Sequence, residues 1–134
     1  MIALKKAVYD KIVGGMDESV HWGTAPAGTA FPYIVLNTYS IVAPEQFIGV
    51  ADMIAPVTIR VTVWAATMEA VDGLIQELEV LFIGQALVTD TGNVMDVAPG
   101  GRDSLLDPDR DPAAGEVWQG VFDLNITYQR QPGE

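Results

Sequence analysis

The residue types that most often carry catalysis are scarce in this chain. His21 is its sole histidine and it has no cysteine, so His and Cys side chains cannot complete a zinc site. A serine nucleophile needs a histidine with an orienting partner, and nothing singles out Ser19, Ser40 or Ser104. We therefore predict a protein that is not an enzyme, with no catalytic residue, no cofactor and no metal.

One acidic segment has part of the spacing of a calcium-binding loop. Asp107, Asp109 and Asp111 occupy positions one, three and five of the EF-hand pattern. Pro112 then replaces the glycine of the sharp turn, and Trp118 replaces the bidentate glutamate. The segment is more typical of a solvated acidic loop, and we treat its three aspartates as candidate interface residues.

A second candidate interface lies in the segment from Ile41 to Ala55, which is unusually apolar for a connection between strands. Its only charged residues are Glu45 and Asp52. Such a segment either covers the core or docks on a partner, and the residues leave both alternatives open. Its apolar candidates are Phe47, Ile48, Val50, Met53 and Ile54.

Composition limits the kind of partner. With 134 residues, 49% of them hydrophobic, the chain has the size and the apolar content of one domain. Eighteen acidic residues against seven basic ones give a net charge of −11, which disfavours binding to phosphate backbones. No secretory signal pattern and no apolar run of about 18 residues is present. We expect synthesis in the cytoplasm of the producing cell and no membrane partner.

Two amphipathic helices are predicted. The first covers Ile2–Val13 and ends at Gly14–Gly15, with its apolar side chains on one face. The second begins at the N-cap Thr67, carries Glu69 and Asp72 in its first turns and runs to Phe82. Its apolar residues recur at helical spacing, which predicts that Leu74, Ile75 and Leu78 are core residues.

Three segments have the composition or the period of strands, namely Phe31–Ser40, Pro56–Trp64 and Val117–Tyr128. In the second, Val57, Ile59, Val61 and Val63 alternate with Thr58, Arg60, Thr62 and Trp64. We expect Val61, Val63 and Leu124 in the core. Residues 86–91 and 93–98 suggest a hairpin, Met16–Ala30 an irregular lead-in, and Pro99–Gly115 a long loop.

These elements predict a single α+β domain over 1–134, with residues 129–134 as a frayed tail. A mostly antiparallel sheet of about four or five strands, with two helices packed on one face, satisfies the apolar stripes. The other face of the sheet carries Thr, Arg and Asn side chains. Either water or a neighbouring subunit covers that face.

The chain also resembles a known family over almost its whole length. After the first helix it carries an Ala-Pro-x-Gly-x-x-Phe-Pro-Tyr-x-Val segment at Ala25–Val35. The strand Val61–Trp64 runs into an amphipathic helix, and Leu105–Asp109 precedes a final strand with Trp118–Leu124. In these motifs and their order, the sequence resembles the tail-terminator, or tail-completion, proteins of long-tailed bacteriophages and phage-like particles.

The resemblance implies a structural virion protein at the head-proximal end of the tail. It implies a homo-oligomeric ring, commonly of six copies, that ends the tail tube and contacts the tube protein and the head's connector or stopper protein. DNA passes through such a ring without specific binding. Another neck or tail-tube component of the same particle is the nearest alternative, and a small-molecule binding module is the remote one.

Overall fold

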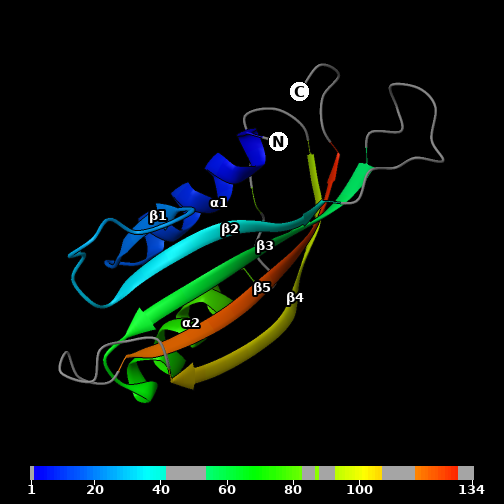
Figure 1. The fold of residues 1–134 in the computed structure, drawn as a ribbon. Coiled ribbons are helices and arrows are strands. Elements are labelled where there is room, and N and C mark those ends of the chain that lie inside the picture. The colour runs from blue at the N-terminus through cyan, green and yellow to red at the C-terminus, as the bar shows by residue number, and fades with distance from the viewer. Residues whose placement is uncertain (1, 42–53, 83–86, 88–92, 107–116, 130–134) are drawn as a thin grey trace.

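The computed structural model describes residues 2–41, 54–82, 87, 93–106 and 117–129. These residues form two helices, α1 (Ile2–Gly15) and α2 (Met68–Phe82). They also form five strands: β1 (Ser19–Trp22), β2 (Tyr33–Ile41), β3 (Ile54–Ala65), β4 (Asn93–Leu106) and β5 (Trp118–Gln129). Figure 1 shows the long strands β2 to β5 running side by side as one strongly twisted sheet.

The strand order in the sheet is β1-β2-β3-β5-β4. Strand β1 runs parallel to β2, and the other three neighbouring pairs are antiparallel. Side chains of both helices join one hydrophobic cluster with the inward residues of β2, β3 and β5. The described part of the chain is therefore an α+β domain with a five-stranded, mostly antiparallel sheet, which confirms the predicted fold class.

Strand β3 shows why the sheet has two different faces. Val57, Ile59, Val61 and Val63 are at most 2% exposed and form the inner face. Their neighbours in sequence point to the outer face, because successive side chains of a strand alternate. Strand β5 repeats the pattern with Phe122, Leu124, Ile126 and Tyr128 inward. All six residues predicted for the core are buried, so that prediction is confirmed.

Helix α2 begins as its sequence predicts. The Ala70 amide donates to the Thr67 hydroxyl oxygen at 3.2 Å, which satisfies one of the free N–H groups of the first turn. The inner face of the helix then buries Val71, Leu74, Ile75, Leu78 and Phe82. Figure 1 shows α2 behind β3 and β5, where these side chains meet the strand residues of the cluster.

Helix α1 buries its predicted face, formed by Leu4, Ala7, Val8 and Ile12. The helix ends at Gly15, the second glycine of the predicted end Gly14–Gly15. Gly15 lies against α2: a β-carbon there would come 2.5 Å from Leu81 Cδ2. The glycine at this position thus permits a close approach of the two helices, and it does not mark a left-handed turn.

Two connections predicted as irregular contain strands. Residues 99–106 belong to β4, so the predicted loop from Pro99 was wrong as far as Leu106. Strand β4 is an edge strand that pairs only with β5 in the described sheet, and proline is tolerated in edge strands because one side of the strand needs no N–H donor. The register with β5 shifts between Pro99 and Arg102, which accommodates the Pro-Gly-Gly sequence. Strand β1 lies within the predicted lead-in. The predicted hairpin segment 86–91 lies outside the described residues, apart from the buried Leu87.

Replacing Leu78 by Ala tests the core. Leu78 is fully buried, so the free energy of unfolding should fall by about 2–5 kcal/mol. Val80→Ala, two residues away at a side chain 72% exposed, should change it by less than about 0.5 kcal/mol. Urea unfolding measures both, and equal costs for the two variants would contradict the buried face of α2.

A pair of glycine variants tests how closely α2 approaches the sheet. A β-carbon on Gly120 of β5 would come 2.3 Å from Val71 Cγ1 and 2.6 Å from Ile75 Cδ1. Gly120→Ala should therefore destabilise the protein by about 1–3 kcal/mol. Gly73→Ala in α2 meets nothing within 4 Å and should stabilise it by roughly 0.5–1 kcal/mol. The midpoints of thermal unfolding of the two variants should shift in opposite directions. An unchanged or raised midpoint for Gly120→Ala would show that α2 stands farther from β5.

Candidate functional site

The outer face of the sheet is the surface that the described helices leave uncovered. Its residues form cross-strand rows. One row is Tyr33, Trp64 and Gln119, and the next is Val35, Thr62 and Val121. The third is Asn37, Arg60 and Asp123. The face thus changes from aromatic to apolar to charged along the strands.

The aromatic row continues into the chain before β2. The Phe31 and Tyr33 rings stack with centroids 5.4 Å apart, and Tyr33 stacks on Trp64 at 6.1 Å. These distances and the small interplanar angles, 15° and 23°, fit offset stacking. Phe31 is 37% exposed, so the stack presents apolar surface to solvent at one end of the outer face.

A short turn places Phe31 on this face. The Thr29 amide donates to the Pro26 carbonyl at 3.1 Å, and the Thr29 hydroxyl donates to the same oxygen. Gly28 within the turn has a φ of +82°, a conformation that glycine adopts at little cost. The Phe31–Pro32 peptide bond is cis. The segment Ala25–Val35, which carries the family resemblance, is therefore one local unit that ends in the aromatic stack.

Beside the aromatic stack the outer face is hollowed. The hollow has a volume of about 350 Å³ and lies between the segment Gly23–Ala25 and the strands. Val35 and Thr62 line it and are only 6% and 7% exposed, although no helix lies over them in the described structure. Trp64 and the amides Asn37 and Gln119 complete its walls. The hollow can take one apolar side chain or a small ligand.

The charged row is held by an ion pair between β3 and β5. Arg60 donates from Nε to Asp123 Oδ1 at 2.9 Å and from Nη2 to Asp123 Oδ2 at 3.2 Å. The two side chains are 34% and 18% exposed. Next to this pair, the Thr58 hydroxyl donates to Asn125 Oδ1 at 2.9 Å at an exposed position. The two parallel hydrogen bonds between Arg60 and Asp123 hold this ion pair in one geometry.

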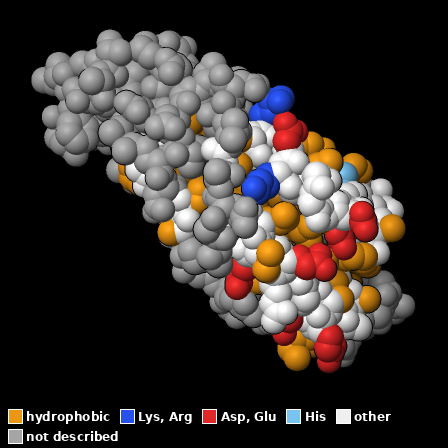
Figure 2. All heavy atoms as spheres, turned by 180° about the vertical axis from the view of Figure 1, so that it is seen from behind, with side chains coloured by type: hydrophobic (Ala, Val, Ile, Leu, Met, Phe, Trp, Pro, Cys, Tyr) orange, Lys and Arg blue, Asp and Glu red, His pale blue; other side chains and the backbone are white. Residues whose placement is uncertain are grey.

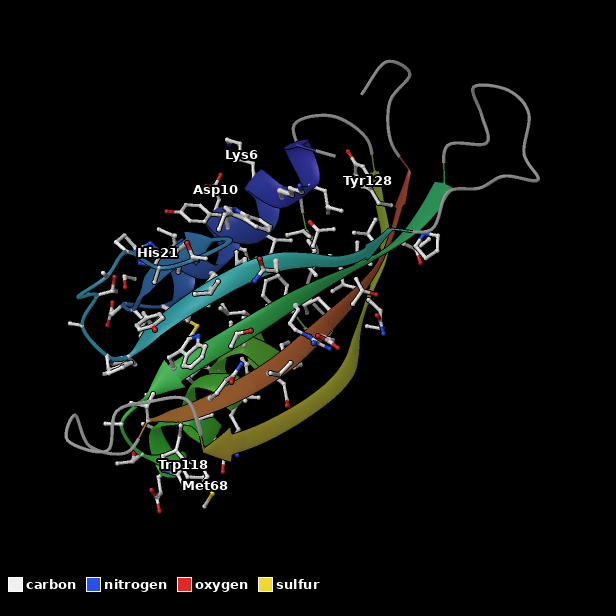
Figure 3. The ribbon with its side chains drawn as sticks, in the orientation of Figure 1. Lys6, Asp10, His21, Met68, Trp118 and Tyr128 are labelled. Carbon is white, nitrogen blue, oxygen red and sulfur yellow. The ribbon has the colours of Figure 1, made fainter. Side chains whose placement is uncertain are left out.

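The opposite, helix-bearing face is divided by charge. Helix α1 carries Lys5, Lys6 and Lys11, the only lysines of the chain, whereas α2 carries four acidic residues and no basic one. Figure 2 shows Lys and Arg side chains toward the upper part of this face and Asp and Glu side chains over its lower part. Lys6 pairs with Asp10 at 2.9 Å on the outer side of α1 (Figure 3). Of the two described helices, α2 is thus the acidic one and α1 the one that carries the lysines.

The residues predicted as interface lie almost wholly outside the described part of the chain. This holds for Phe47, Ile48, Val50, Met53, Asp107, Asp109 and Asp111, whereas Ile54 is the first residue of β3.

His21 lies in β1 and is half-buried, and its Nε2 atom is buried without a hydrogen-bond partner (Figure 3). Within the described ranges no three His, Asp or Glu side chains gather as metal ligands, and no helix is long and apolar enough to cross a membrane.

The aromatic stack and its hollow are the features that sequence reasoning missed. The period of β3 places Trp64 on the outer face, and the same alternation places Tyr33 there. The pairing of Tyr33 with Trp64 depends on the register between β2 and β3, which the local sequence pattern does not determine.

Compared with protein-family models and with curated proteins, the chain matches none.

A double-mutant cycle tests the charged row. Arg60 and Asp123 are each replaced by Ala, singly and together. The coupling energy between them should be about 1 kcal/mol, because two hydrogen bonds fix the ion pair and it is partly shielded from solvent. The same cycle on Thr58 and Asn125, an exposed cross-strand pair on the same strands, should give roughly 0.2–0.5 kcal/mol. Urea unfolding gives all the values needed. A coupling at Arg60–Asp123 no larger than that of the control would show that solvent screens the ion pair.

Proposed function

We propose that this chain is a structural subunit of a phage or phage-like tail, which forms a ring that ends the tail tube and joins it to the head. The observation that carries the proposal is the unit Ala25–Val35. Its residues match the family pattern, and in the fold they build a turn that presents the stacked aromatic rings on an uncovered sheet face. An apolar patch with a polar rim is typical of a protein interface.

The fold supports assembly in a second way. Both helices are used to cover the inner face of the sheet. The outer face is left with Tyr33, Trp64, Val35 and Val121 beside a fixed ion pair. A neighbouring copy or the tube protein would bury the apolar rows and leave the charged row at the rim.

Charge supports passage of DNA rather than binding of DNA. The chain carries −11 overall, and the first turns of α2 present Glu69 and Asp72 without a basic residue. An acidic surface turned toward the opening of a ring repels the phosphate backbone. In such a ring DNA slides past without being held, as a conduit between head and tail requires.

The hollow beside Trp64 favours a second candidate function, a small-molecule binding module. Its volume of about 350 Å³ lies at the lower end of the range for ligand pockets. Its buried Thr62 hydroxyl and two side-chain amides would supply polar contacts. Such a module would function without self-assembly, so particle morphology separates the two candidates.

Electron microscopy of particles from a producing strain that lacks this chain tests the proposed function. We expect over-long tails or tails not joined to heads, because nothing stops the tube or presents a surface to the connector. Supplying the wild-type chain from a plasmid should restore joined particles of uniform tail length. Normal tails joined to filled heads in the deletion strain would rule the proposal out.

A further inference from the structure

One exposed apolar side chain stands out on α2. Val80 is 72% exposed, the highest value among the large hydrophobic residues that the structure describes. Glu77 lies one turn before it on the same side of the helix and Glu79 lies next to it in sequence. We call Val80 with Gln76 and Glu77 the knob: an exposed apolar side chain beside negative charge, at the wall of a hollow of about 720 Å³.

A hollow with the opposite character lies on α1 and β1. It has a volume of about 500 Å³ and is lined by Lys5, Lys6, Tyr9 and Trp22. Tyr9 and Trp22 are packed against the core and are only partly buried. The Lys5 ammonium stands over the Trp22 ring, 5.9 Å from its centroid. We call these four residues the socket: aromatic walls with the Lys5 ammonium and with Lys6, which pairs with Asp10.

The knob of a subunit does not enter the socket of the same subunit. No residue of α2 lines the socket. Val80 and Glu77 instead line a separate hollow with Gly15 and Met16, at the other end of α1 from Lys5. Among the described residues, the knob and the socket of one copy are therefore two separate surfaces.

We propose that the knob of one copy docks into the socket of the next copy, with Val80 against Tyr9 and Trp22 and the Glu77 carboxylate beside Lys5. The inference rests on the proposed function, which requires identical copies to assemble. The contact is heterologous, since each copy offers a knob on one side and a socket on another. Contacts of this kind generate rings where the rotation closes.

Charge identifies the occupant of the socket as a second copy. The chain has three lysines, and all of them lie on α1. Helix α2 has four acidic residues and no basic one. Opposite potentials speed encounter and fix register, while two sockets or two knobs placed together repel each other.

Disulfide trapping tests the contact directly, because the natural chain has no cysteine. A copy with Lys6→Cys is mixed with a copy with Val80→Cys at high concentration and oxidised. We expect covalent heterodimers, and a ladder of longer oligomers when one chain carries both changes. The matched control pairs Lys6→Cys with Val13→Cys, an apolar residue of α1 that is 48% exposed and belongs to neither surface.

Charge exchange gives an independent readout. Sedimentation velocity should show self-association weakened about tenfold or more by Lys5→Glu or by Glu77→Lys, and largely restored when one chain carries both. Val80→Lys should weaken it as well, whereas Val13→Lys should leave it unchanged. Trapping no stronger than in the control pair, or Val80→Cys homodimers in place of heterodimers, would overturn the proposal.

The two proposals can fail separately. A ladder of trapped oligomers together with normal tails in the deletion strain would keep this contact and remove the proposed function. Over-long tails together with no specific trapping would keep the proposed function and show that its ring uses other surfaces.

Discussion

The structure depends on one constraint: the apolar inner face of a twisted sheet must be covered by two helices at close range. Gly120 on β5 makes the approach of α2 possible, because any side chain there would meet Val71 and Ile75. Gly15 does the same where α1 meets Leu81. The first contact permits the close packing of α2 on the sheet, and the second permits the close packing of α1 on α2.

Because both helices pack on the inner face, neither described helix covers the outer face of the sheet. The outer face offers the aromatic stack around Tyr33 and the ion pair of Arg60 with Asp123. The helix surfaces offer a basic socket on α1 and an acidic knob on α2. Two of these four features lie on the sheet and two on the helices, so both faces of the described domain carry surface that a partner could contact.

Periodicity predicted most of the fold. The alternation of Val57 to Trp64 and the stripe from Val71 to Phe82 each depend only on local spacing, and both elements were found where the sequence placed them. Strand β1 and the second half of β4 were not predicted, because Ser19–Trp22 is too short to show a period and Pro99-Gly100-Gly101 has the composition of a turn. Both are edge strands held by one neighbour. The aromatic stack, the socket and the knob join residues distant in sequence, so only the fold reveals them.

The central claim is that identical copies of this chain close into a ring on the end of a tail tube. Negative-stain electron microscopy of the purified protein, alone at high concentration and mixed with tail tubes, tests it most directly. The account predicts closed rings of uniform diameter, free or seated on tube ends, commonly with six copies. Single particles of one subunit in both samples, with bare tube ends, would contradict it.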